Sequence, residues 1–230
     1  MTSFIDNDAA AEVVALRPKA RRVFLLSPAN ASGIRARLIL GEQARFELAV
    51  RLRESRVPLG EIFSFISGLY FRGKLAYAHA FAEPPAAAPG ILIITASRGL
   101  VPPETPLTLD ELREIAEVPI HAGDPRYRGP LERDALHLAQ QIGSGGEVVL
   151  LGSIATPKYV EPLLGIFGDH LMFPADFVGR GDMSRGGLML RSARDGVQLR
   201  YVSVAKSLRH GPRPPKQPKL PRVSCRPSDK

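Results

Sequence analysis

The sequence predicts an α/β fold: a single three-layer domain with a mainly parallel central sheet. Continuous apolar runs of strand length recur along the chain, and segments with helical periodicity separate them. No period of about 20 to 50 residues repeats, which argues against a solenoid. At 230 residues the chain is long enough for one full core with appendages and short for two cores.

The strands are expected where apolar residues run without interruption, as in parallel strands covered on both faces. The runs RVFLLS, ILIITA and EVVLL indicate buried strands at 22–27, 91–96 and 147–151. A shorter run predicts a fourth strand at 170–173. Residues 198–204 alternate apolar and polar side chains, which is typical of an antiparallel or edge strand.

Helices are expected between these strands. Thr108 and Glu111 form a capping-box pattern at the start of one of them. Ser184 is a candidate N-cap for the last helix. Residues 61–66 are expected as a strand or apolar loop, and 67–71 as a turn. The expected helical segments are 34–54 with a break near Gly41, 72–82, 109–118, 128–142, 159–167 and 184–193.

The composition and residue spacing argue against membrane, secreted and zinc-binding proteins. The chain is 44% hydrophobic and 23% charged, which suits a globular protein. No apolar run approaches the roughly 20 residues of a membrane helix, and residues 1–14 do not resemble a signal peptide. The single cysteine, Cys225, favours a reducing, cytoplasmic location. The histidine spacings do not suit zinc, and no metal or cofactor is expected.

The net charge of +8 lies mainly at one end. Residues 206–230 contain eight basic residues and one acidic residue, and so carry +7 of it. Residues 208–230 are also rich in proline, and we expect them to be disordered. Residues 1–20 are expected to be a flexible lead-in, which leaves 21–207 as the α/β domain. A mobile cationic tail would favour salt-dependent binding of nucleic acid, although it would serve equally as a solubilising extension.

Ligands of open α/β sheets bind at the carboxyl ends of the strands, so the residues after each run are candidate contacts. Serine and glycine amides and arginine side chains there would suit a phosphate. The alternative is that these residues only make turns. The candidates are Ser27, Asn30, Ser32 and Arg35 after the first run, Ser97 and Arg98 after the second, Ser153 after the third, and Arg180, Ser184 and Arg185 after the fourth.

Two further segments carry candidate chemistry. In SGLYFRGKLAYA, Tyr70 and Phe71 stand beside Arg72 and Lys74, a pattern in which one ring would stack a base and the cations would hold its phosphate. The alternative is that Phe71 and Tyr77 pack in the core while Arg72 and Lys74 are solvated. In FPADFVGRGDMSRGG, Asp182 and, second, Asp176 are candidate catalytic carboxylates, as a general base or a stabiliser of an oxocarbenium ion. Helix capping is the alternative there.

Standard nucleotide and hydrolase fingerprints are absent. No Gly-x-Gly-x-x-Gly follows a strand, no Gly-Lys-Ser/Thr occurs, and no Gly-x-Ser-x-Gly marks a nucleophile elbow.

The segments LYFRGKLAYA, ILIITASRGLVPPETPL, VVLLGSIATPKYV and GRGDMSRGG resemble a loosely defined set of uncharacterised bacterial domains. Those domains are similar in layout to the uracil-DNA glycosylase-like α/β fold. The likeness spans about residues 22–201, but Gly73 stands later than the pattern has it and no glycosylase water-activating motif is present. The resemblance implies a nucleotide or nucleic-acid context.

We therefore predict a domain that handles a nucleobase, nucleoside or nucleotide, with N-glycosidic chemistry as the most specific expectation. The alternative is a non-catalytic nucleic-acid-binding module that uses its basic tail.

Overall fold

A six-stranded sheet in the order β4-β3-β1-β6-β7-β8 forms the centre of the computed structural model, which describes residues 21–207, 211–212 and 214–215. Its four inner strands run parallel to one another, as predicted. The two edge strands are antiparallel to their neighbours. The inner strands are β1 (Arg21–Leu26), β3 (Ile91–Ile94), β6 (Gly146–Leu151) and β7 (Leu171–Pro174), and the edge strands are β4 (Leu100–Val101) and β8 (Tyr201–Ser203).

The inner strands are apolar throughout because both of their faces are covered. Val23, Phe24, Leu25 and Leu26 of β1 are fully buried, although successive side chains point to opposite faces of the sheet. The same holds for residues 148–151 of β6. Helices on the two faces supply this cover, so the apolar runs are a direct consequence of the three layers.

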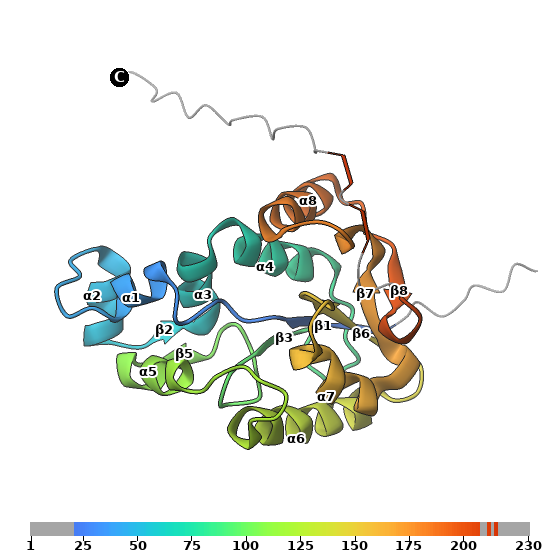
Figure 1. Cartoon of the computed structure of the whole chain (residues 1–230), viewed down its shortest axis with the longest axis horizontal. Coiled ribbons are helices and arrows are strands. Elements are labelled where there is room, and N and C mark those ends of the chain that lie inside the picture. Colours follow the sequence, from blue (N-terminus) through green and yellow to red (C-terminus); the bar gives the residue numbers. More distant parts are fainter. Residues whose placement is uncertain (1–20, 208–210, 213, 216–230) are drawn as a thin grey trace, which may run out of the picture.

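The helices divide between the two faces (Figure 1). On one side lie α3 (Leu59–Ser67), α4 (Leu69–Phe81) and α8 (Asp182–Asp195). On the other side lie α6 (Pro125–Ile142) and α7 (Pro157–Phe167). This arrangement confirms the predicted α/β fold with a mainly parallel sheet.

A smaller group of elements lies beside this body (Figure 1). Its two-stranded sheet pairs β2 with β5 in antiparallel fashion. Short single-turn 3₁₀ helices complete the connections after α7, β7 and β8. The group comprises α1 (Ile34–Leu40), α2 (Glu47–Glu54), β2 (Val57–Pro58), β5 (Pro106–Leu107) and α5 (Leu109–Glu117), and the 3₁₀ helices are η1 (Gly168–His170), η2 (Ala175–Phe177) and η3 (Val204–Lys206).

Two local predictions are wrong. Residues 61–66 are helical and belong to α3, which buries Ile62, Phe63 and Ile66 on one side. A short apolar run does not by itself distinguish a buried helix from a strand. The predicted turn at 67–71 is confined to Gly68, whose φ of 58° separates α3 from α4, so the second helix begins at Leu69.

The start of α8 also differs from the prediction. Gly181 is its N-cap, and Ser184 lies inside the first turn, where its hydroxyl accepts a hydrogen bond from Arg180. The capping box of α5 is confirmed, since Thr108 Oγ1 accepts from the Glu111 amide and the Glu111 carboxylate accepts from the Thr108 amide.

Two glycines allow α4 and α8 to pack closely. A Cβ atom on Gly73 would lie 2.6 Å from the Gly186 carbonyl oxygen, and one on Gly186 would lie 2.8 Å from the Leu69 carbonyl oxygen. Real Cβ atoms do not come so close to backbone. The glycines of two distant motifs therefore form one contact, and this contact sets the start of α8 beside α4.

The predictions for residues 1–20 and for most of 208–230 lie outside the described residues.

Candidate functional site

A pocket of about 740 Å³ opens at the carboxyl edge of the sheet. From β1 the chain crosses to β3 on one side and later reaches β6 and β7 on the other, so the strand order reverses between β1 and β6. Ser27, which follows β1, and Ser153, which follows β6, both line the pocket. The pocket thus occupies the topological switch point, where open α/β sheets bind their ligands.

Lys74 of α4 lies beneath this pocket, almost completely buried at 1% exposure. Its amine nitrogen Nζ donates to the Ser27 backbone oxygen and to the Ser27 hydroxyl, each at 2.7 Å. It also lies 4.1 Å from the centre of the Tyr70 ring. Burial lowers the pKa of Lys74 to about 7, with Asp182 opposing the shift and Arg185 adding to it.

Ser27 is held in place from three sides. Its amide and hydroxyl both donate to the Leu151 carbonyl oxygen at 3.2 Å, which ties it to the end of β6. Gly152 faces it closely, since a Cβ atom at position 152 would lie 2.9 Å from the Ser27 Cβ. The Ser27 hydroxyl is therefore fixed between the Lys74 amine and the end of the neighbouring strand, at the wall of the pocket.

Tyr70 forms another part of the wall and has an unusual hydroxyl. This hydroxyl is buried, and none of the described residues makes a hydrogen bond of good geometry to it, although Arg185 and Ser27 lie near enough to lower its pKa slightly. Burial raises the pKa of Tyr70 to about 12, so the group is a neutral O–H donor. Because buried polar atoms are nearly always hydrogen-bonded, a donor without a partner in a pocket wall indicates that an occupant of the pocket would accept its hydrogen bond.

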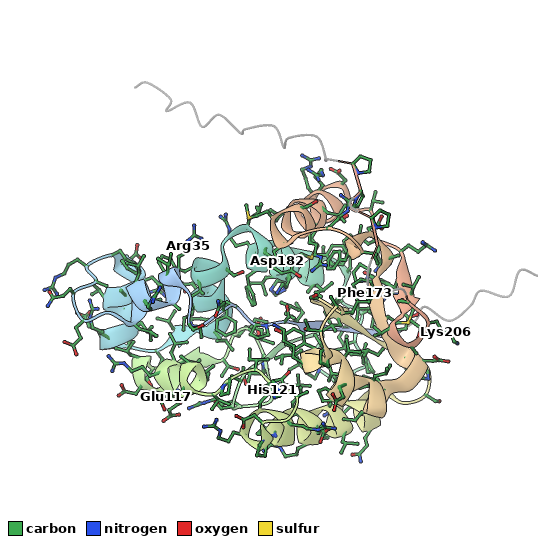
Figure 2. The ribbon with its side chains drawn as sticks, viewed as in Figure 1. Arg35, Glu117, His121, Phe173, Asp182 and Lys206 are labelled. Atoms are coloured by element: carbon green, nitrogen blue, oxygen red, sulfur yellow. The ribbon has the colours of Figure 1, made fainter. Side chains whose placement is uncertain are left out.

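The first turn of α8 brings a carboxylate to the pocket. Asp182 lines it with a side chain that is 67% exposed, and lies 3.6 Å from the largely buried Arg185 guanidinium. Arg185 also donates two hydrogen bonds to the Phe177 carbonyl oxygen, which fixes it against the preceding loop. Asp182 is labelled in Figure 2, near the end of α8 that meets α4.

The start of α7 supplies a cation and a second aromatic wall. Lys158 and Tyr159 both line the pocket, and the Tyr127 hydroxyl donates to the Lys158 carbonyl oxygen at 2.8 Å. Thr156, the N-cap, makes no side-chain capping bond. The first amides of a helix lack partners within the helix, so this end combines free donors, a helix dipole and an ammonium group, all of which suit an anion.

The structure brings together about half of the predicted site residues. Lys74 and Arg185 lie directly behind the pocket wall, in contact with residues that form it. The predicted residues that line the pocket itself are Ser27, Asn30, Ser32, Tyr70, Ser153 and Asp182.

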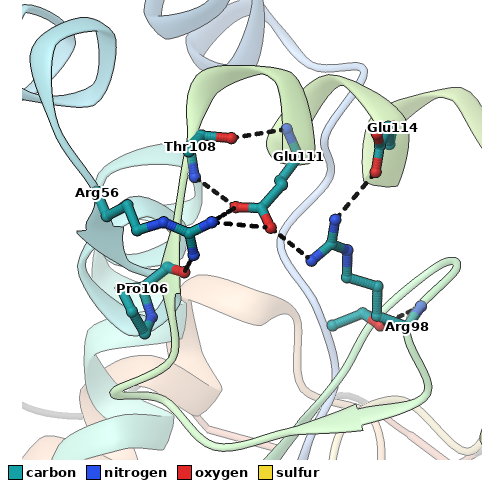
Figure 3. A network of polar contacts seen from close by, with 7 residues as sticks. Arg56, Arg98, Pro106, Thr108, Glu111 and Glu114 are labelled. Carbon is teal, nitrogen blue, oxygen red and sulfur yellow. Dashed lines mark hydrogen bonds and ion pairs between the residues drawn. The ribbon is translucent and has the colours of Figure 1, made fainter.

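The other predicted residues lie elsewhere. Arg98 donates to Glu111 and Glu114 in a network that joins the exit of β3 to α5 (Figure 3). Arg56 completes this network through Glu111 and Pro106. The pKa of Glu111 is lowered, chiefly by the hydrogen bond from the Thr108 amide. The arginine after β3 therefore holds the flanking elements to the sheet.

The remaining candidates are also outside the pocket lining. Arg180 donates to the Asp176 carbonyl oxygen and to Ser184, so its hydrogen bonds stay within the segment that joins β7 to α8 and the first turn of α8. Ser97 does not line the pocket although it follows β3. Arg35, Arg72 and Asp176 are exposed on the surface.

Sequence reasoning missed several lining residues, of which Lys158 and Tyr159 matter most. The sequence held a signal for them: Thr156-Pro157, a few residues after β6 ends, is a helix-start pattern with proline at the first helical position. Residues 115–120, at the end of α5, also line the pocket.

Within the described ranges, no group of three or more histidine, cysteine, aspartate or glutamate side chains could hold a metal ion. In the same part of the chain, none of the helices has the length and hydrophobicity needed to cross a bilayer.

Comparison with protein-family models, with curated proteins and with solved structures finds no match to this chain. Fold and site alone define its class: an α/β protein with a mainly parallel six-stranded sheet and a pocket at the switch point between β1 and β6.

Proposed function

We propose that the chain is an enzyme that binds a nucleobase, nucleoside or nucleotide in the pocket at the switch point. The observation that carries this proposal is the unpartnered Tyr70 hydroxyl in the pocket wall, a neutral donor that a ring carbonyl or ring nitrogen of a base would satisfy. The pocket volume of about 740 Å³ falls within the usual range for small-molecule sites.

The lining favours a ligand with an aromatic part and an anionic part. Tyr70 and Tyr159 offer aromatic surface for a base. Lys158, at the start of α7, offers charge and helix amides for a phosphate. Lys158 thus takes the role that the sequence suggested for Arg98, whose guanidinium is paired with two glutamates.

Asp182 is the carboxylate placed to act on a sugar between these two ends. Its exposed oxygens line the pocket, and Arg185 lies close enough to orient them. In N-glycosidic cleavage, such a group would activate water or stabilise the oxocarbenium-like sugar.

The test is a panel of nucleosides, nucleotides and short single-stranded nucleic acids, with base release followed by chromatography and binding by thermal shift. A ligand present at 100 times its Kd should add about 2.7 kcal/mol to the free energy of unfolding. Asp182→Asn should lower base release by about 100-fold or more. Destabilisation should stay below about 1 kcal/mol, because the Asp182 carboxylate is exposed and Arg185 keeps its hydrogen bonds to the Phe177 carbonyl oxygen.

Asp176→Asn is the matched control, because Asp176 lies in η2, six residues before Asp182, and outside the pocket lining. It should leave base release unchanged. Full turnover by Asp182→Asn would remove the catalytic role, and a panel with neither binding nor base release would overturn the proposal.

The second candidate function, nucleic-acid binding through the basic tail, is favoured by the +7 charge of residues 206–230. A chain ending at Ser207 separates the two within the same panel. Loss of polyanion binding with retention of nucleotide binding would make the tail accessory, whereas loss of the only detectable binding would favour the second candidate.

A further inference from the structure

The Ser27–Lys74 pair has a geometry that nucleotide binding does not require. The amine lies 2.7 Å from the serine hydroxyl, although the two residues are 47 positions apart in the chain. Ser27 lines the pocket, whereas Lys74 is shielded from solvent behind it. A hydroxyl at a pocket wall with a nitrogen base bonded to it from the protein side is the arrangement that activates a serine nucleophile.

A purely structural lysine would be expected to have a carboxylate partner. None of the ion pairs in the described part of the chain includes Lys74. Its direct contacts are the Ser27 oxygens and the rings of Tyr70 and Phe71. Three charged groups act on the amine from farther away: the Asp182 carboxylate raises the pKa of Lys74, whereas Arg185 and Lys158 lower it, and burial outweighs them. Burying an ammonium group in such surroundings is unfavourable, so near neutral pH a substantial fraction of Lys74 carries no proton and can accept one.

The pocket also contains groups that would stabilise the negative charge formed on the oxygen when a nucleophile attacks a carbonyl group. Lys158 and the uncapped first turn of α7 line the same cavity as Ser27 and would stabilise a developing oxyanion. The Tyr70 hydroxyl, which lacks a partner, is available to donate to a leaving group. The nucleophile and the donors therefore line one cavity, with the base directly behind its wall, and they come from the residue after β1, from α4 and from α7.

We propose that Ser27 is a nucleophile and Lys74 its general base, acting on an ester, thioester or activated amide bound in this pocket. Ser27 Oγ forms a bond to the carbonyl carbon while its proton passes to Lys74 Nζ. The bond from that carbon to the leaving group breaks, and the leaving group takes the proton from Lys74. Water then attacks the acyl-serine, gives a proton to Lys74 and releases the acid, and Ser27 regains its proton.

This proposal goes beyond nucleotide binding, and it is tested without a nucleotide. The full-length chain is treated with an alkyl fluorophosphonate, which reacts with activated serines. Ser27 Oγ replaces fluoride on phosphorus, and the adduct is measured by intact mass and located by peptide mass spectrometry. We expect one adduct, on Ser27, and a labelling rate that rises with pH through about 7 as Lys74 loses its proton.

Ser27→Ala should abolish labelling, and Lys74→Met should slow it by about 100-fold or more. Ser97→Ala is the matched control, because Ser97 follows the parallel strand β3 without a lysine at its hydroxyl, and it should label as the native chain does. Circular dichroism and thermal unfolding show which variants are folded.

An unlabelled Ser27 in the native chain would overturn the proposal, and so would a folded Lys74→Met variant that labels at the native rate. If Lys74→Met does not fold, the pH profile of the native chain decides, since a rate independent of pH between 6 and 9 would contradict a role for Lys74 as base. Labelling is independent of the nucleotide panel, so either proposal can fail alone.

Discussion

The segments that follow the parallel strands β3 and β1 each contain a serine with a cation beside it. The two cations differ in burial and in their hydrogen-bond partners. Arg98, after β3, is partly exposed and pairs with two glutamates of α5. Lys74, beside the end of β1, is buried and has two oxygens of Ser27 as its hydrogen-bond acceptors. A guanidinium neutralised by carboxylates holds elements together, whereas a buried amine without a carboxylate in direct contact is in a position to exchange protons.

The largest effect is expected from a substitution that forces α8 away from α4. Gly186→Ala would place a Cβ atom 2.8 Å from the Leu69 carbonyl oxygen and 2.9 Å from the Tyr70 Cα. Backbone on both helices must shift, so we expect a loss of about 3 kcal/mol in the free energy of unfolding, measured by urea denaturation.

Gly165→Ala on α7 is the control for that loss, because nothing lies within 4 Å of a Cβ atom there. It should stabilise the chain by about 0.5–1 kcal/mol. Equal effects of the two substitutions would show that the contact between α4 and α8 is not tight.

The next largest effect is expected in the pH dependence of stability, to which the buried Lys74 amine should contribute and the paired Arg98 guanidinium should not. The pKa of Lys74 is about 7 in the folded chain and 10.5 as an ordinary lysine. Between these values the unfolded chain binds the extra proton, so the free energy of unfolding should rise with pH, by about 2 kcal/mol between pH 7 and 9. Urea denaturation at each pH measures this slope.

Lys74→Met should lose this rise, whereas Arg98→Ala should keep it. A native chain whose stability is unchanged between pH 7 and 9 would mean that Lys74 keeps its proton, as a salt-bridged cation does.

The smallest effect is expected at the exit of β3. Arg98→Ala removes two partly exposed ion pairs to Glu111 and Glu114, which should cost about 1 kcal/mol or less. Ligand binding in the thermal-shift panel should be unchanged because Arg98 lies outside the pocket lining. Loss of ligand binding in the Arg98→Ala variant would show that Arg98 contributes to the binding site.

The sequence predicted the sheet well because continuous apolar runs have one plain cause, burial on both faces. The prediction fails at residues 61–66, because an apolar run as short as that of Ile62 and Phe63 has no clear period by which a helix differs from a strand. The helix over 72–82 was expected, but its start at Leu69 depends on the positive φ of Gly68.

The site was only partly predictable, because a local sequence pattern does not show which side chains from distant parts of the chain come into contact. Lys74 and Ser27 were both candidates, but their contact spans 47 positions and depends on how α4 lies against β1. Arg98 was a candidate too, and no local pattern shows that Glu111 and Glu114 neutralise it. Lys158 could have been found from the helix-start pattern before it.

Gly152 leaves just enough room for Ser27, since a Cβ atom there would lie 2.9 Å from the Ser27 Cβ and 3.1 Å from its hydroxyl oxygen. A methyl group at 152 and a hydroxymethyl group at 27 compete for the same space. In related sequences the two positions should therefore vary together: any homologue with a larger residue at 152 should have a glycine at 27 and should lack the serine chemistry altogether.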